Sequence, residues 1–564
     1  MVDHAPKTET AARPSLLTGD PVVLLAGVLL IGVAAWRARY GISIYDSSHY
    51  TVEAVRLAQG IRPFVDDMTL QSTGFLAAGP FAKLWMLAFG RTGIELALRL
   101  FFVALAAGSG AIVFRALRPS FGPWPSLLAA AVPLLAPPYN VLAVSYNTMA
   151  LLGFTVGTAL AFSAARDESR AAAAGAGAAF AFGVVSYPPL MIGAAVGLAA
   201  FALVTRSPRL AAWMLAGAAA VAAPVFAWLL ATGSLSGLQG TMARGAAMTS
   251  GDLPARLRRF RLNLSGAREQ LTRLNAWPAW ALAVAALLPL RPRWIRAAAL
   301  GLVPLAVALP ALGHVSTGQY YIGVIGAVML LAFVAVAFVP VTVWSAAGSG
   351  RDARRLLWLA APLGLVDTVL VVYSTNAGWS RGTAFVGFAP LAMAVVALWS
   401  YVIAERGGKM LAAAAGVSLV AVVVVMLFAT AFQDGFPVDM KASITHGAYA
   451  GMRTIPYRAK ELEAIEAVGR RCMRPDDSVL VFRAPGVYLL LPGRILTSAT
   501  WLEKGPSDHF ALEYLARRND MPTIVVAQRE DMDPLPPDDP LLQTVAADYR
   551  LVGETEQLLF YRRR

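Results

Sequence analysis

The side chains best suited to chemistry follow the first long apolar run of the chain, in the segment YDSSHYTVEAVRLAQGIRPFVDDMTLQSTGF, residues 45–75. Asp46 stands where a helix running to Gly60 should begin. A carboxylate at a helix start stays ionised and can take a proton from an attacking hydroxyl group, as general-base catalysis requires. The alternative interpretation is that Asp46 only caps the helix. Capping and catalysis are compatible.

Helical spacing groups the neighbours of Asp46 on two faces. Asp46, Tyr50 and Glu53 fall at positions i, i+4 and i+7. His49, Glu53 and Arg56 form a second face that overlaps the first. We expect Glu53 to be the second catalytic carboxylate, and His49 and Tyr50 to contact the substrate.

Two adjacent carboxylates, Asp66 and Asp67, end the same segment. They could bind substrate or a divalent cation such as Mg²⁺ or Mn²⁺, because such ions prefer oxygen ligands. They could equally be ordinary solvated loop residues. No cofactor is expected to be required and no metal ligands are assigned. The chain has no HExxH, P-loop or GxSxG motif, which leaves protease, NTPase and α/β-hydrolase activities without support.

The composition is that of a membrane protein. Of the 564 residues, 57% are hydrophobic and 15% are charged, and the mean hydropathy is +0.59, whereas soluble domains carry about 25% charged residues. The apolar runs predict an α-helical polytopic protein with about 13 transmembrane helices and outer interfacial helices. The predicted spans lie near residues 21–36, 93–115, 124–138, 141–163, 172–186, 188–204, 210–231, 277–290, 295–312, 319–344, 356–374, 382–403 and 409–432.

Charge predicts how these spans are oriented. Every second loop is basic, and the positive-inside rule makes those loops cytoplasmic. The basic residues are Arg115, Arg118, Arg166, Arg170, Arg206, Arg209, Arg291, Arg293, Arg296, Arg351, Arg354, Arg355, Arg406 and Lys409. The net charge of +14 is thereby explained without a nucleic-acid partner. We expect a bacterial plasma membrane protein with a disordered cytoplasmic segment 1–20, a transmembrane catalytic domain 21–432 and outer loops 45–92 and 232–276.

The stretch GFLAAGPFAKLWMLAF at 74–89 is apolar as well. Counting it as a span would place every later basic loop outside. We therefore expect it to be a helix that lies on the outer surface of the membrane.

The outer loop 232–276 is unusually basic, with seven arginines against Asp252 and Glu269. Apolar residues recur in it at helical spacing, which predicts an amphipathic helix. One interpretation is a helix that binds the head groups of membrane lipids. The other is that Arg256 and Arg259 hold the phosphate of a lipid-linked substrate, because guanidinium groups match phosphate oxygens.

The tail 433–564 has a soluble composition and is predicted to be an extracytoplasmic α/β domain. Helices are expected over 456–472 and 507–518. SVLVFRA at 478–484 and PTIVVAQ at 522–528 are typical of buried strands, and the last residues of a hairpin. Cys472 is the single cysteine, which excludes an intrachain disulfide.

Further candidates lie along the spans. His314, Tyr320 and Arg381 are placed at their outer ends and are assigned to substrate binding. Asp367 lies within a span, where it could carry protons or make a structural hydrogen bond, the latter being favoured slightly. Glu95 and Arg99, at i and i+4, should satisfy each other. They are not assigned to the site.

These motifs resemble the GT-C class of integral-membrane glycosyltransferases, which includes protein O-mannosyltransferases, lipid A aminoarabinose transferases and actinobacterial arabinofuranosyl and mannosyl transferases. The resemblance rests on YDSSHYTVEAVRLAQGIRPFVDD after the first span, on FGRTGIELALRL, on GQYYIGVIGAVMLLA and on the outer tail. It implies an inverting transfer of a sugar from a polyprenyl-phosphate donor to a glycan, lipid or protein acceptor on the outer face. Asp46 is the implied base.

Two positions depart from the family's pattern. Where some relatives carry a second acidic residue, this chain has Tyr146 and Asn147, which are assigned to substrate binding. Where some carry a lysine that meets the donor phosphate, it has Gln71. Two other functions remain open: a transporter or flippase of a lipid-linked glycan, and a non-catalytic envelope assembly protein. Transporters usually show internal repeats, which this sequence lacks.

Overall fold

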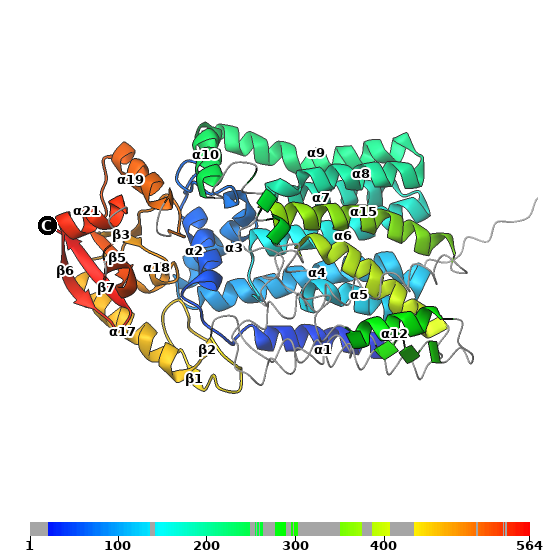
Figure 1. Cartoon of the computed structure of the whole chain (residues 1–564), viewed down its shortest axis with the longest axis horizontal. Coiled ribbons are helices and arrows are strands. Elements are labelled where there is room, and N and C mark those ends of the chain that lie inside the picture. Colours follow the sequence, from blue (N-terminus) through cyan, green and yellow to red (C-terminus); the bar gives the residue numbers. More distant parts are fainter. Residues whose placement is uncertain are drawn as a thin grey trace, which may run out of the picture.

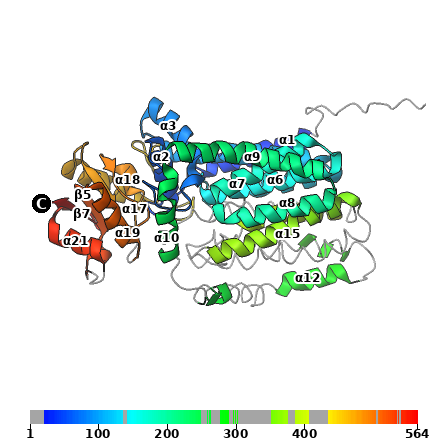
Figure 2. The ribbon, with the colours of Figure 1, turned by 90° about the horizontal axis from the view of Figure 1, so that it is seen from above.

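The computed structural model describes residues 21–135, 141–248, 277–288, 350–374, 386–405, 434–502, 506–533 and 539–564, together with scattered residues between 254 and 302 and residue 535. Long helices run alongside one another in a bundle, and an α/β domain made by the tail sits at one end of it (Figure 1). Short helices fill the junction between the two (Figure 2).

The bundle is built from apolar helices. They are α1 (Pro21–Arg37), α4 (Ile94–Phe121), α5 (Pro123–Leu135), α6 (Tyr146–Asp167), α7 (Arg170–Ser186), α8 (Met191–Thr205), α9 (Pro208–Ala231), α12 (Trp277–Leu287), α15 (Arg351–Ser374) and the helix Val386–Glu405. Within the described residues, six helices are long and apolar enough to cross a membrane. The chain is therefore a multi-pass membrane protein.

The predicted spans inside the described ranges fall on these helices. Those over 319–344 and 409–432, and most of 295–312, lie outside the described residues. The total of about thirteen spans stays a prediction.

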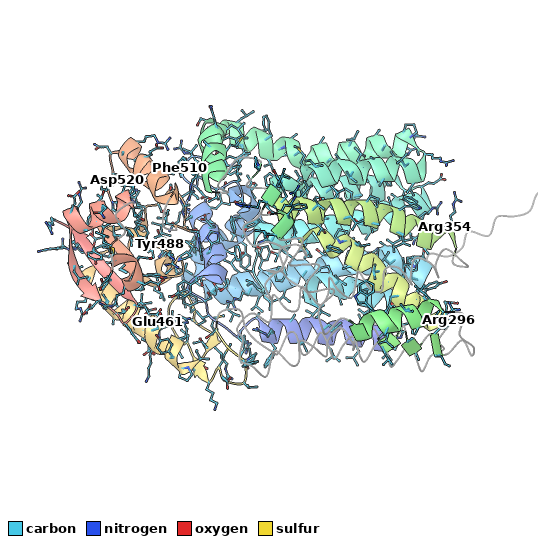
Figure 3. The ribbon with its side chains drawn as sticks, in the orientation of Figure 1. Arg296, Arg354, Glu461, Tyr488, Phe510 and Asp520 are labelled. Atoms are coloured by element: carbon cyan, nitrogen blue, oxygen red, sulfur yellow. The ribbon has the colours of Figure 1, made fainter. Side chains whose placement is uncertain are left out.

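Two arginines of the predicted basic loops lie at the same end of the bundle. Figure 3 places Arg296 and Arg354 at the end remote from the C-terminal domain. The assignment of that basic end to the cytoplasm remains a prediction from charge.

The junction is formed by α2 (Asp46–Ala58), η1 (Ser72–Phe75), α3 (Ala78–Phe89), η3 (Pro188–Leu190), η4 (Ser234–Gly237) and α10 (Leu238–Met248). The predicted interfacial stretch 74–89 is a short 3-10 turn followed by the 12-residue α3, which is too short to span a bilayer. α3 packs on α2 through Gly79, where a Cβ atom would lie 2.7 Å from Leu57. Leu84 and Leu87 remain exposed, as expected for a helix that contacts lipid.

The C-terminal domain is a five-stranded sheet in the order β4-β3-β5-β7-β6. The strands are β3 (Ser478–Val481), β4 (Arg494–Ile495), β5 (Ile524–Gln528), β6 (Tyr549–Glu554) and β7 (Leu558–Arg563), preceded by a small pair, β1 (Ala442–Ser443) and β2 (Arg453–Thr454). β3 runs parallel to β4 and β5, and β7 runs antiparallel to β5 and β6. The helices are α17 (Pro456–Cys472), α18 (Val487–Leu490), α19 (Pro506–Arg518), α20 (Arg529–Met532) and α21 (Pro540–Asp548).

The predicted helix 456–472 is α17, and the predicted terminal hairpin is β6–β7. The strand predicted over 478–484 is shorter, because Arg483 has a positive φ of 54° and turns the chain out of the sheet.

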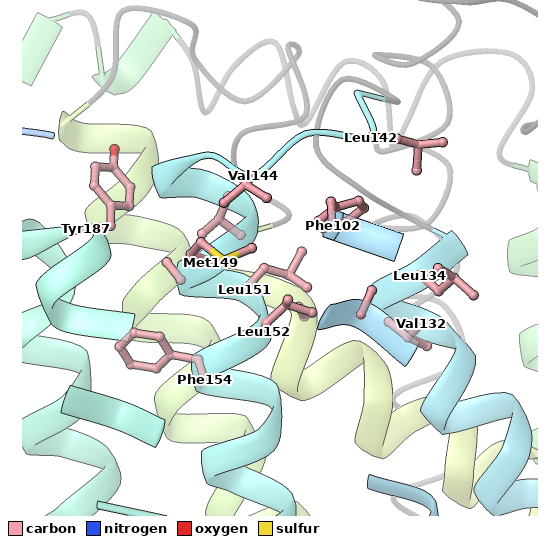
Figure 4. Packing of buried hydrophobic residues seen from close by; sticks show 14 of the residues in the cluster. Phe102, Val132, Leu134, Leu142, Val144, Met149, Leu151, Leu152, Phe154 and Tyr187 are labelled. Carbon is pink, nitrogen blue, oxygen red and sulfur yellow. The ribbon is translucent and has the colours of Figure 1, made fainter. Parts of the chain in front are cut away.

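The bundle core consists mainly of alanine, valine and leucine side chains. Phe102, Met149 and Phe154 are almost fully buried in it (Figure 4). α7 and α9 approach each other closely at Gly177 and Gly217. A Cβ atom at Gly177 would lie 1.7 Å from Met214 O, and one at Gly217 would lie 1.8 Å from Ala174 O. Small residues at such crossings let helix backbones meet, as is usual in membrane bundles.

We expect Gly177→Ala to lower the melting temperature, because the added methyl group must push α9 away; overpacking of this kind costs roughly 1–3 kcal/mol. Gly108→Ala is the control, since a Cβ atom there has no neighbour within 4 Å. It should leave stability unchanged or raise it, because Ala is the better helix former by about 1 kcal/mol. The measurement is thermal melting of the purified variants in detergent. Equal melting temperatures for the two variants would contradict the close approach of α7 and α9 at Gly177.

Candidate active site

Helix α2 begins at Asp46, directly after the segment that leaves the bundle. The N-cap is Tyr45, which makes no side-chain cap bond, and the His49 N–H group donates to Tyr45 O at 3.2 Å. Asp46 is therefore the first residue inside the helix and does not occupy the N-cap position. The Asp46 side chain lies outside what the structure describes, so its role as a base stays a prediction. The helix ends at Ala58, and the chain turns at Gly60 with a φ of 91°.

The centre of the junction is the guanidinium group of Arg56. Its Nη1 lies 3.2 Å from both carboxylate oxygens of Glu53 and 3.7 Å from Asp67 Oδ1. Its Nη2 donates to Asp66 O at 2.7 Å and to Thr497 O at 2.9 Å. The Arg56, Glu53 and Asp67 side chains are 2% exposed or less. One buried cation thus joins α2, the loop after it and the C-terminal domain.

Neither of the adjacent carboxylates is a solvated loop residue, so that interpretation is wrong. Asp67 is fully buried, faces Arg56 and accepts a bond from Thr69 Oγ1 at 2.9 Å. Asp66 is 8% exposed and pairs with Arg62 and Arg518, each at 3.1 Å. The two side chains point to different cations, which does not suit shared coordination of one ion.

These surroundings shift the pKa values of Asp66 and Asp67 in opposite directions. Burial, and then the nearby charge of Glu53, raise the pKa of Asp67 to about 8 against the opposing effect of Arg56. Burial also acts to raise the pKa of Asp66, but hydrogen bonds from Arg62 and the charges of Arg62 and Arg518 outweigh it and hold that pKa below its usual value.

His49 and Glu53 meet through a residue of the C-terminal domain. His49 Nδ1 lies 2.6 Å from Thr500 Oγ1, and the same hydroxyl group donates to Glu53 Oε1. Thr500 is fully buried, whereas His49 is partly exposed. The predicted face of His49, Glu53 and Arg56 is confirmed as one connected set of contacts.

Tyr50 lies beside His49 and belongs to an aromatic cluster at the end of the bundle. Its ring centroid lies 6.3 Å from that of Phe75 and 6.1 Å from that of Tyr146. Tyr146 in turn lies 5.4 Å from Tyr187. Asn147 follows at the start of α6 and is 2% exposed, and its Oδ1 has no hydrogen-bond partner within the described ranges. The structure thus places Tyr50 and Tyr146 together, with Asn147 beside them in sequence.

The C-terminal domain also holds the chain just before Asp46. Gly486 N donates to Ile44 O at 2.7 Å, and Tyr449 Oη donates to Ser48 Oγ at 2.8 Å. A Cβ atom at Gly486 would lie 2.6 Å from Ile44 Cα, so only glycine fits. Reasoning from the sequence missed Thr500, Tyr449 and Gly486, because nothing local marks residues that act on a segment about 400 positions away.

Two interpretations of isolated acids have different outcomes. Glu95 accepts from Arg99 Nε at 2.9 Å, as predicted. Asp367 is fully buried, and in the part of the chain that the structure describes neither of its carboxylate oxygens has a hydrogen-bond partner. The preference for a structural hydrogen bond at Asp367 is not supported there. The carboxylate lies against Gly193, where a Cβ atom would be 1.5 Å from Asp367 Oδ1.

Five assigned residues lie outside the described residues: Arg256, Arg259, His314, Tyr320 and Arg381. Of the same arginine-rich loop, Arg244 is described; it is 1% exposed and donates to Met68 O at 2.8 Å. No group of three or more His, Cys, Asp or Glu residues in the described ranges is placed to hold a metal ion. The use of a divalent cation stays an untested possibility.

No protein-family model matches the chain, and no curated protein matches it in sequence. A solved structure of ArnT from Cupriavidus metallidurans in the apo state is 15% identical, with a TM-score of 0.49 over 96% of this chain and 98% of that chain. ArnT bound to undecaprenyl phosphate is 14% identical, with a TM-score of 0.41 over 96% and 97%.

An oligosaccharyltransferase of Archaeoglobus fulgidus, tethered with an acceptor peptide, is 12% identical, with a TM-score of 0.46 over 96% of this chain and 74% of that chain. Both proteins are glycosyltransferases of the class that the sequence resembles. At these identities and TM-scores the likeness gives no information about the residues of the site.

The buried Asp67 predicts a pH dependence of stability. Its pKa is about 8 in the folded protein and about 3.9 in an unfolded chain. Because the folded state holds the proton more tightly, this side chain's contribution to stability is lost as pH rises from about 4 through about 8. We expect Asp67→Asn to remove that loss, so its advantage in melting temperature over the wild type should grow with pH.

Asp66→Asn is the matched control, since the pKa of Asp66 is shifted in the opposite direction. It should lower stability above the unfolded pKa of about 3.9 and lose that effect as pH falls below it. Melting curves from about pH 5 to pH 9 separate the two variants. If the melting temperatures of the wild type and of Asp67→Asn changed with pH in the same way, the raised pKa of Asp67 would be contradicted.

Proposed function

We propose that this protein is a membrane glycosyltransferase that moves a sugar from a polyprenyl-phosphate donor to a glycan, lipid or protein acceptor outside the membrane. The observation that carries the proposal is the position of α2. The helix starts with Asp46 at the end of a multi-pass bundle, and the C-terminal domain contacts the chain on both sides of that residue. A carboxylate in this place can act on a polar acceptor while the lipid part of a donor stays in the bilayer.

The reaction follows from the roles of these groups. Asp46 takes the proton of the acceptor hydroxyl group, and the hydroxyl oxygen attacks the anomeric carbon from the face opposite the phosphate. The bond between that carbon and the phosphate oxygen breaks, the electron pair leaves with the polyprenyl phosphate, and the configuration inverts. Arg256 and Arg259 are proposed as ligands of the phosphate, since arginine pairs with phosphate in a bidentate manner. Glu53 supports the site by keeping Arg56 and Thr500 in place.

A transporter or flippase of a lipid-linked glycan is the second candidate, and Asp367 is the observation that favours it. An ionisable residue within the membrane is a functional candidate by default. Asp367 is fully buried and lacks a hydrogen-bond partner among the described residues. Under this alternative Asp367→Asn would abolish function and Asp46→Asn would not.

Asp46→Asn tests the transferase directly. We expect transfer to fall by roughly 10²–10⁴, the range of a general base. The fold should survive, because losing one charge at a helix start costs only about 0.3–1 kcal/mol. Asp66→Asn and Asp67→Asn should lower turnover less. Turnover and melting temperature are measured on the same preparations, and an Asp46→Asn enzyme as active as the wild type would overturn the mechanism.

A second test concerns the side of the membrane on which the C-terminal domain lies. Val438 is 78% exposed at the start of the tail, and Arg170 is exposed at the basic end of the bundle. In a Cys472→Ser background, a membrane-impermeant thiol reagent should label Val438→Cys in intact cells. Arg170→Cys should react only after the cells are opened. The reverse pattern would place the proposed site in the cytoplasm.

A further inference from the structure

The hydroxyl group of Thr500 has a single proton, and its neighbours decide where that proton goes. Glu53 Oε1 accepts from Thr500 Oγ1, and both carboxylate oxygens of Glu53 lie 3.2 Å from the Arg56 guanidinium group. Both oxygens of this carboxylate face donor groups, and Glu53 accepts from Thr500 and from Arg56. The Thr500 proton therefore points to Glu53, and toward His49 the hydroxyl oxygen can only accept.

This direction determines the tautomer of His49. His49 Nδ1 lies 2.6 Å from Thr500 Oγ1, so Nδ1 must carry the proton and donate. Burial, together with the charge of Arg56, lowers the pKa of His49 although Glu53 opposes the shift, and the ring is neutral at neutral pH. In a neutral ring with its proton on Nδ1, Nε2 keeps a lone pair and can only accept.

Nε2 has no hydrogen-bond partner among the described residues, and the His49 ring is partly exposed. The ring is bordered by Tyr50, Phe75 and Trp501, with centroids 5.4, 6.1 and 6.2 Å away. Phe75 and Trp501 meet the imidazole ring edge-on and Tyr50 meets it at a tilt, and such contacts favour a defined arrangement of the rings. His49 lies three residues after Asp46 on the same helix.

We propose that His49 Nε2 is a substrate-binding atom that accepts a hydrogen bond from a hydroxyl group of the sugar or of the acceptor, and that Thr500 and Glu53 are positioning residues that keep it an acceptor. The inference rests on the proposed function and assigns part of its substrate contact. It also explains why a threonine from the C-terminal domain reaches the catalytic helix: the site is complete only when the domain is docked.

The tautomer can be measured without any assay of activity. Nitrogen-15 spectra of protein labelled at its five histidines are compared with those of His49→Gln to find the His49 signals. We expect a neutral ring with its proton on Nδ1 in the wild type and in Thr500→Ser, which keeps the hydroxyl group. Thr500→Val, which has the same shape without the hydroxyl, should show a mixture. A wild-type ring with its proton on Nε2 would contradict the proposed hydrogen bonds from His49 to Thr500 and from Thr500 to Glu53.

A double-mutant cycle then tests the substrate contact. Thr500→Val should lower kcat/KM about tenfold, the effect of losing one hydrogen bond in a buried site. Thr500→Ser should stay within about twofold, and Thr500→Val should add little in a His49→Gln background. An equal loss in both backgrounds would show that Thr500 acts independently of His49. Absence of transfer by the wild type itself would instead overturn the proposed function, and the contact with it.

Discussion

The junction between the membrane bundle and the C-terminal domain depends on one buried cation, Arg56. Its guanidinium group pairs with Glu53 on its own helix and with Asp67 on the following loop, and it donates to the Thr497 carbonyl of the tail. Removing the Glu53 carboxylate would leave the buried charge of Arg56 without its closest partner, a loss that costs about 3–5 kcal/mol in buried ion pairs. Helix α2, the loop after it and the domain are therefore held as one unit.

A second group of contacts holds the segment that leads into α2. Ile42 N donates to Asp434 Oδ2 at 2.7 Å, and Gly486 and Tyr449 bind this segment on the other side. The tail thus binds the main chain before Asp46 and the Ser48 side chain after it. Catalysis needs reacting groups held in a narrow range of geometry. Under the proposed function, the C-terminal domain helps to position the catalytic helix rather than being an appended module.

The junction also shows how one segment supplies acids with different properties. Asp66 and Asp67 are neighbours in sequence, yet the first pairs with Arg62 and Arg518 while the second faces Arg56 in a closed interior. Their pKa values move in opposite directions for that reason. The bundle contributes to the structure in another way. Close packing of α7 and α9 at Gly177 and Gly217 fixes the positions of these two helices.

The sequence by itself determined the membrane class, the apolar helices, the alternating basic loops, α17 and the segment that carries the site, because periodicity, hydropathy and charge act over a few turns of chain. It also predicted the pairing of Glu95 with Arg99 and the common face of His49, Glu53 and Arg56. Only the tertiary structure decided that Tyr45 occupies the N-cap position of α2, that Asp67 is buried and that Thr500 joins His49 to Glu53. Each of these depends on where two distant stretches of chain meet, and burial and hydrogen bonding between such stretches leave no mark on either one alone.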